Sequence, residues 1–344
     1  MIGGMVGRLL EPRALSSSEV RATFDALVAP DATEAERAAI LVSLAARRES
    51  AEELAEFARE MRRRARPFPL ARGDRPLDLC GSGGAPRPSF NVSTVSAFVV
   101  AAAGASVVKH GNRSARGPCG SSDLLEALGL PVTSSEAFAR ESYRRYRLAF
   151  LHAPLFHPAT KAVAPVRKLL GIPTIFNRLG PLSNPAHVPY QVVGMPHRNA
   201  ARLVAAVLPR LGVTRGLAMS SADGCDEFSP RARTAAIAWG DGRSRSLAFR
   251  PEAFLPPEDR RGDWGPLAPS EAAAEAERLL AGGGGARRGA VLLTAGAALW
   301  VAGRSRSFGD GVDRARSALD DGRAERRLHE MQALAARYVP TKVS

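Results

Sequence analysis

Alternation of short apolar strands with helices constrains the fold of this chain more than any other feature of the sequence. A strand is expected at residues 77–80, and a helix over 93–103 begins behind Asn91. A second strand is expected at 105–108 and a second helix at 121–129. Strands joined by crossover helices form a parallel sheet, which binds its ligands at the carboxyl ends of the strands. The sequence therefore predicts an α/β fold with a mostly parallel central sheet.

A glycine-rich loop, Gly81-Ser82-Gly83-Gly84, connects the first strand to its helix. Such a turn brings backbone N–H groups and the positive end of a helix dipole to one point, which favours an anion. Taken alone, the loop is more often a plain tight turn. It matches neither standard glycine motif, because Pro86 replaces the last glycine of G-x-G-x-x-G and no Walker A Lys-Ser or Lys-Thr pair follows.

Two further loops at the same expected sheet edge are rich in hydrogen-bond donors. Residues 109–114, Lys-His-Gly-Asn-Arg-Ser, follow the second strand, and Gly120-Ser121-Ser122-Asp123 opens the next helix. Amide, hydroxyl and cationic donors from three loops suit a ligand that carries several phosphates.

Adjacent acidic residues, Asp226 and Glu227, follow a strand expected at 216–220. Such a pair is normally part of a solvated turn. After a buried strand and beside a polyphosphate ligand it indicates Mg²⁺, which takes one or two carboxylates plus substrate oxygens.

The composition favours a soluble protein. The 344 residues are 45% hydrophobic, and no apolar run is long enough to cross a membrane. The N-terminal segment lacks the features of a signal peptide. Three cysteines without C-x-x-C spacing suit a reducing environment, so a cytoplasmic location is expected.

A net charge of +14 is compatible with a nucleic-acid partner. The basic residues are, however, spread along the chain, and aromatic residues make up only 6%. The short clusters Arg62-Arg63-Arg64, Arg144-Arg145 and Arg326-Arg327 lie far apart in the sequence. Each is expected to be solvated surface, and nucleic-acid binding stays the less favoured alternative.

Residues 16–66 are expected to form helices, because three capping-box spacings precede apolar residues at helical period. Pro67 and Pro69 end this pattern. The expected organisation is a small α-helical domain, residues 1–70, followed by an α/β domain, residues 71–344. Helices expected at 287–301 and 312–338 close the second domain.

Four motifs in gapless register are similar to those of the anthranilate phosphoribosyltransferase family. They read GSGG at 81–84, FNVST at 90–94, VVKHGNRS at 107–114 and GSSDLLEALG at 120–129. The family pattern is close to GTGGD, FNIST, AKHGNR and GSADVLEALG. The resemblance extends to residues 149–186, to DGCDE at 223–227 beside the family's DGLDE, and to residues 291–303.

This resemblance implies a reaction: transfer of the phosphoribosyl group of phosphoribosyl pyrophosphate (PRPP) to the amine of anthranilate, a step of tryptophan biosynthesis. Pyrophosphate leaves, positive charge develops on the sugar, and the protein positions both substrates and neutralises the leaving group. The resemblance also implies Mg²⁺ and a homodimer formed through the helical domain, with part of 150–190 packed on that domain. Another aromatic amine as acceptor, or a non-catalytic nucleic-acid-binding paralogue, stays open.

The resemblance also assigns roles to particular residues. The acceptor site is assigned to Gly81, Asn112 and Arg167, whose guanidinium faces the aromatic carboxylate. Metal binding is assigned to Ser93, Asp226 and Glu227. PRPP binding is assigned to Gly81, Gly84, Ala85, Ser89, Asn91, Val92, Ser93, Thr94, Lys109, His110, Gly111, Asn112, Arg113, Ser114, Ala115, Arg116, Gly117 and Cys119.

Some positions depart from the family pattern. Ala85-Pro86 replaces Asp-Gly, which removes a carboxylate and an N–H donor. Cys119 replaces a serine, Ser220-Ser221 replaces His-Gly, and Thr160 replaces methionine. These changes leave open an altered acceptor or a loss of catalysis. Arg87 adds a cation to the first loop, where it is expected either to turn toward the pyrophosphate or to be solvated.

Overall fold

Four helices form the N-terminal domain of the computed structural model, which describes residues 2–47, 49–82, 85, 87–114 and 117–338. They are α1 (Ile2–Leu10), α2 (Ser17–Val28), α3 (Glu34–Ala46) and α4 (Ala51–Arg63). All three expected capping boxes are present, at Ser16, Thr33 and Ser50. Each cap hydroxyl accepts from the backbone of a glutamate three residues on, so local contacts define where α2, α3 and α4 begin.

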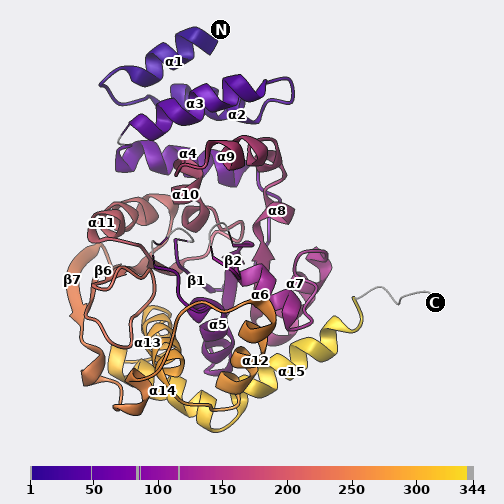
Figure 1. Ribbon diagram of the computed structural model, residues 1–344, viewed down its shortest axis with the longest axis vertical. Coiled ribbons are helices and arrows are strands. Elements are labelled where there is room, and N and C mark those ends of the chain that lie inside the picture. Colours follow the sequence, from indigo (N-terminus) through magenta and orange to yellow (C-terminus); the bar gives the residue numbers. More distant parts are fainter. Residues whose placement is uncertain (1, 48, 83–84, 86, 115–116, 339–344) are drawn as a thin grey trace.

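A later segment of the chain packs on this helical domain. It contains α8 (Ala153–Phe156), α9 (Ala164–Leu170) and α10 (Ile175–Leu179). In Figure 1 α9 lies level with α4, and α10 and α8 lie closer to the sheet. Val166 and Phe176 belong to the same buried cluster as Phe24 of α2, and the Phe24 and Phe176 ring centroids are 6.3 Å apart. A domain boundary at residues 70 and 71 remains our proposal.

A seven-stranded sheet forms the centre of the second domain, with strand order β3-β2-β1-β4-β5-β6-β7. The first five strands in this order are parallel, and β6 and β7 are antiparallel to their neighbours. The strands are β1 (Leu77–Cys80), β2 (Val107–Gly111), β3 (Leu148–His152), β4 (Tyr190–Gly194), β5 (Arg215–Ser221), β6 (Thr234–Gly240) and β7 (Arg243–Phe249). The expected α/β class with a mostly parallel sheet is confirmed.

The second strand differs from the sequence expectation. It begins at Val107 rather than at residue 105 and continues to Gly111, so Lys109 and His110 belong to the strand and not to the loop behind it. The reason is long-range, since β2 pairs with β3 along its whole length.

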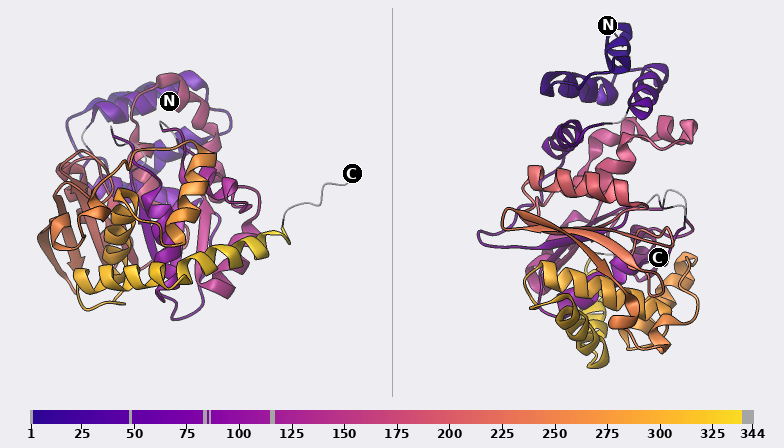
Figure 2. Two further views of the ribbon diagram at one scale, coloured as in Figure 1. Left: turned by 60° about the horizontal axis from the view of Figure 1, so that its bottom comes forward. Right: turned by 90° about the vertical axis from the view of Figure 1, so that its left-hand side faces the viewer.

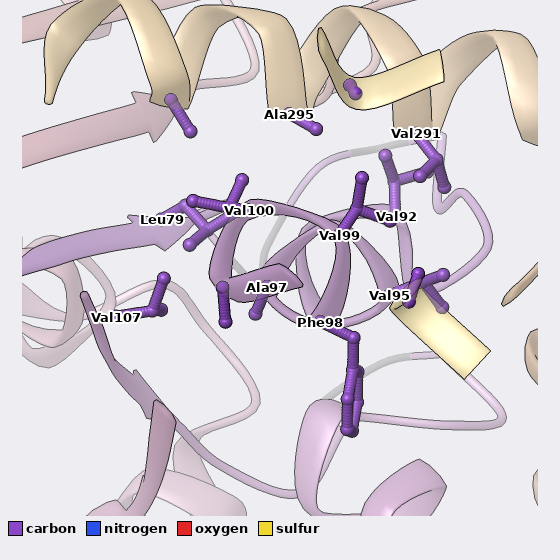
Figure 3. Packing of buried hydrophobic residues seen from close by; sticks show 14 of the residues in the cluster. Leu79, Val92, Val95, Ala97, Phe98, Val99, Val100, Val107, Val291 and Ala295 are labelled. Atoms are coloured by element: carbon purple, nitrogen blue, oxygen red, sulfur yellow. The ribbon is translucent and has the colours of Figure 1, made fainter. Parts of the chain in front are cut away.

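Helices cover both faces of the sheet. In Figure 2, right, the indigo N-terminal helices and the yellow C-terminal helices lie on opposite sides of it. The remaining helices are α5 (Val92–Ala102), α6 (Ser121–Ala127), α7 (Glu136–Tyr146), α11 (Arg198–Val207), α12 (Pro269–Leu280), α13 (Ala286–Val301), α14 (Phe308–Asp320) and α15 (Arg323–Ala335). Figure 3 shows Val92 and Val99 of α5 facing Val291 and Ala295 of α13 in the core.

One helix expected at 312–338 is two helices, α14 and α15. Gly322 between them has a φ of 73°, a left-handed conformation that glycine adopts without steric cost. Nothing in the described part of the chain is a helix long and apolar enough to cross a membrane.

Candidate active site

A cleft of about 290 Å³ opens at the carboxyl ends of β1, β2 and β5. Most of the predicted site residues line it, and they come from loops that are far apart in the sequence. These are Gly81, Ala85, Ser89, Asn91, Ser93, Thr94, Lys109, His110, Gly111, Asn112, Arg113, Ser114, Gly117, Cys119, Arg167, Asp226 and Glu227. Val92 instead has its side chain in the core, beside α13. Gly84, Ala115 and Arg116 lie outside the described residues.

The glycine loop after β1 contacts the acidic loop after β5. Ser82 donates its amide and its hydroxyl to the Asp226 carboxylate, both at 2.7 Å. A Cβ on Gly81 would stand only 2.8 Å from Asp226 Oδ2, so this close approach requires glycine.

Lys109 is buried where these loops meet. Its ammonium donates to the Leu79 carbonyl at 2.6 Å and to Ser93 Oγ at 3.1 Å. The Ser93 amide, at the start of α5, donates to Glu227 Oε1 at 3.3 Å. Ser93 therefore links Lys109 to Glu227, because its hydroxyl accepts from the ammonium and its amide donates to the carboxylate. Ser93 is also a predicted metal ligand.

Asp226 and Glu227 are both buried, and this burial has an electrostatic cost. Desolvation, together with the neighbouring Asp226 charge, raises the pKa of Glu227 to about 8. No group of three or more His, Cys, Asp or Glu side chains arranged to hold a metal is found within the described ranges. Two carboxylates and a serine hydroxyl fit Mg²⁺, which completes its coordination with substrate oxygens and water.

Ser221, one of the departures from the family pattern, supports the acidic loop. Its hydroxyl donates to the Glu227 carbonyl at 2.7 Å and accepts from the Ser229 amide at 3.1 Å. The Ser221 hydroxyl therefore stabilises the conformation of the acidic loop through hydrogen bonds to two of its backbone groups.

The loop after β2 is folded around Asp123. This carboxylate accepts from the amides of Gly120 and Ser114 at 2.8 and 3.1 Å and pairs with Arg113 at 2.7 Å. Arg113 also pairs with Glu126, so its charge is partly neutralised within the chain. Burial raises the pKa of Cys119 to about 11, which keeps the thiol protonated at neutral pH.

Arg167 of α9 lies at the other end of the cleft. Its guanidinium carbon is 5.3 Å from the centre of the Phe176 ring, and burial lowers its pKa. Among the described residues no carboxylate pairs with it. An unpaired guanidinium beside an aromatic ring suits an aromatic carboxylate, which offers both a charge and a flat face.

Several lining residues were not predicted from the sequence. Ser82, Phe176, Asn177, Gly180 and Pro181 line the cleft. Four of them lie in the segment 149–186 that resembles the family, but within it only Arg167 was assigned a role in the site. The sequence signal was the motif FNRLGPL, which does not say which of its side chains face the ligand.

Arg87 and two histidines, His152 and His157, lie apart from the cleft lining. Arg87 is exposed to solvent. His152 is buried, and its Nδ1 lies 2.8 Å from Ser122 Oγ. His157 is buried as well, with its ring centre 5.0 Å from that of His110. Both histidines thus occupy packed positions.

Comparison with known families defines the class of protein. Residues 5–65 match the helical bundle domain of a glycosyl transferase family, and residues 73–325 match its α/β domain. The fold is therefore that of a two-domain glycosyl transferase.

Comparison with individual relatives identifies the family within this class of glycosyl transferases. Anthranilate phosphoribosyltransferase of Lacticaseibacillus casei is 38% identical over 97% of both chains. Anthranilate phosphoribosyltransferase 2 of Streptomyces coelicolor is 42% identical over 91% of this chain and 93% of its own. This chain belongs to the anthranilate phosphoribosyltransferase family.

Solved structures agree with this assignment. The Thermus thermophilus anthranilate phosphoribosyltransferase superposes with a TM-score of 0.88 at 36% identity, over 96% of this chain and 99% of that one. The Saccharomyces cerevisiae enzyme in complex with PRPP and Mg has the same fold, with a TM-score of 0.86 at 23% identity over 98% of both chains.

Proposed function

We propose that this protein transfers the phosphoribosyl group of PRPP to the amine of anthranilate, releasing pyrophosphate. The proposal rests on one observation: a single cleft has two ends that differ in chemistry. One end has amide, hydroxyl and ammonium donors beside two buried carboxylates, and the other has Arg167 beside Phe176.

The chain's own residues divide the work between these ends. The loops after β1 and β2 bind the phosphates with backbone amides, and Lys109 adds a buried positive charge near the leaving group. Arg167 and Asn112 orient anthranilate so that its amine faces the anomeric carbon. Because the amine is itself nucleophilic, positioning and charge neutralisation account for the catalysis without a strong general base.

Mg²⁺ belongs to this proposal, with Ser93, Asp226 and Glu227 as the residues that hold it. When bound, the ion neutralises charge on the pyrophosphate. A Saccharomyces cerevisiae relative is described in complex with PRPP and Mg, which supports this part of the proposal.

Two alternative functions remain to be tested. Transfer to another aromatic amine uses the same cleft, and the changes at Thr160 and Cys119 motivate it. A nucleic-acid-binding role is less favoured, because Arg63, Arg64, Arg144, Arg145 and Arg327 each form an ion pair with a carboxylate of the chain itself.

We further propose a cytoplasmic homodimer that associates through the helical domain and the segment with α9 that packs on it. Exposed apolar side chains motivate it: Leu10 is 62% exposed, Val42 44%, Leu169 76% and Ile172 43%. Light scattering after gel filtration should give a dimer for the wild type and for Lys168→Glu, and a weakened dimer for Leu169→Glu. A monomeric wild type would refute this association.

The test of the function is a pyrophosphate-release assay with purified protein, PRPP, Mg²⁺ and anthranilate. We expect release that depends on all three additions, with phosphoribosylanthranilate detected by its mass. Release with a different aromatic amine only would select the first alternative. Salt-dependent DNA retention without turnover would select the second.

A further inference from the structure

Pairing between β1 and β2 stops after one pair of residues. Leu77 and Val107 are register partners, whereas β1 pairs with β4 through all four of its residues and β2 with β3 through all five. The two strands therefore separate toward their carboxyl ends, where the cleft begins.

Separation releases backbone groups that a regular ladder would pair. Continued from Leu77 and Val107, a parallel ladder would use the Val108 carbonyl, the Leu79 carbonyl and the His110 amide. All three lie in buried residues, where an unpaired polar group is costly.

Three side chains satisfy these groups instead. Asp78 Oδ1 accepts from the His110 amide at 3.2 Å, and Lys109 Nζ donates to the Leu79 carbonyl at 2.6 Å. The Asn184 amide donates to the Val108 carbonyl at 2.8 Å and, at 2.9 Å, to Asp78 Oδ2. Both Asp78 and Asn184 are buried, with 1% and 0% of their surface exposed.

We propose that Asp78, held by Asn184, is a positioning residue that keeps β1 and β2 apart and thereby sets the place of Lys109 and the loop behind it. Both of its carboxylate oxygens are used, one on the backbone of β2 and one on Asn184. A carboxylate suits this position because it accepts on both oxygens, whereas an amide replaces one acceptor by a donor.

The same pair joins the two ends of the cleft. Asn184 follows directly on the segment that contains the cleft-lining residues Gly180 and Pro181. His110 Nδ1 lies 3.3 Å from the Gly180 carbonyl, so the strand that Asp78 positions also contacts the acceptor end. As a positioning role for catalysis, the inference rests on the proposed function.

Gln191 offers a matched control. It is the register partner of Asp78 on β4, it is fully buried, and its side chain donates to the Pro181 carbonyl at 2.6 Å. Gln191→Leu therefore removes a buried polar contact next to Asp78 without touching β2.

The test is hydrogen–deuterium exchange of the ligand-free full chain, which requires no turnover. In Asp78→Asn we expect exchange in residues 107–114 to rise at least roughly ten-fold, because one acceptor of the carboxylate is replaced by a donor facing Asn184. In Gln191→Leu the same peptides should exchange as in the wild type. Unchanged exchange at 107–114 in Asp78→Asn, or an equal rise in Gln191→Leu, overturns the proposal.

Kinetics supply the second readout. Asp78→Asn should raise the KM for PRPP at least about ten-fold and more than that for anthranilate, because Lys109 and most of the displaced loop are assigned to PRPP. A general loss of stability would instead lower the active fraction without raising either KM. An unchanged KM for PRPP overturns the positioning role. If Asp78→Asn fails to fold, Asn184→Ser removes the donor that holds Asp78 and must raise exchange in the same peptides. Absence of transferase activity in the wild type would refute the proposed function but leave the exchange comparison decisive for Asp78.

Discussion

Asp226 accepts two hydrogen bonds from Ser82, one from the amide and one from the hydroxyl, across 144 residues of sequence. Through this contact the loop after β1 and the loop after β5 form one wall of the cleft. Any side chain at residue 81 would collide with the Asp226 carboxylate.

Gly81→Ala should weaken PRPP binding. The added Cβ would lie 2.8 Å from Asp226 Oδ2, so the carboxylate or the loop has to move, at a cost of about 1–3 kcal/mol. We expect a higher KM for PRPP and a lower unfolding midpoint. Gly7→Ala, where no atom lies within 4 Å of the new Cβ, is the control and should leave the KM unchanged. If the KM of Gly81→Ala for PRPP equalled that of the wild type, the Asp226 carboxylate could move away from the new Cβ without loss of binding energy.

Arg167→Ala should raise the KM for anthranilate far more than that for PRPP. Loss of a charge-assisted hydrogen bond costs about 1.5–3 kcal/mol, which corresponds to roughly 10- to 100-fold in affinity. Initial-rate kinetics with each substrate varied in turn measure the split. Lys168→Ala removes an exposed charge at the next position and should have little effect. Equal changes in both KM values would argue against the acceptor role of Arg167.

The double variant Asp226→Asn, Glu227→Gln should lose Mg²⁺-dependent turnover and keep its fold. Amides are poor Mg²⁺ ligands, and as neutral groups they carry no cost for desolvating a buried charge, so the fold should tolerate both substitutions. Activity is measured across a Mg²⁺ titration and the fold by circular dichroism. Asp223→Asn, in the same loop but only partly buried, is the control. Full turnover by the double variant would exclude these carboxylates as ligands.

Arg87→Ala should leave the Mg²⁺ dependence of PRPP binding unchanged. Arg87 is exposed and lies outside the cleft lining, so water and salt screen its charge. Calorimetric titration of PRPP at several Mg²⁺ concentrations compares the two proteins. A variant that needs more Mg²⁺ would show that Arg87 turns toward the pyrophosphate.

Asp78 should make stability depend on pH. Burial raises the pKa of Asp78 from 3.8 to about 6, against the lowering effect of Lys109. Because the folded state holds this proton more tightly, the contribution of Asp78 to wild-type stability falls as the pH rises from about 4 to 6. Relative to Asp78→Asn the loss should reach about 3 kcal/mol, since the other titrating groups cancel in the difference. Denaturant unfolding of both proteins at several pH values measures it, and a constant difference would contradict it.

Features set by short-range contacts were predictable from the sequence. The capping boxes at Ser16, Thr33 and Ser50 depend on residues three apart, and each begins a helix as expected. The strand at 77–80 has the expected bounds. The alternation of strand and helix was enough to predict the parallel part of the sheet and the edge that carries the cleft.

Features that depend on pairing between distant segments were decided by the tertiary structure. The strand β6, the true end of β2 and the break at Gly322 were not predicted, since each reflects a neighbour far away in sequence or a backbone angle. No spacing in the sequence indicates that Asp226 binds Ser82 or that Arg167 lies on Phe176. Asp78 and Asn184 are 106 residues apart and carry no motif that joins them. The sequence by itself thus determined the helix starts, the parallel sheet and the chemistry at its edge, because these follow from local pattern. The folded chain decided which buried polar groups meet, because only packing brings distant side chains within hydrogen-bond distance.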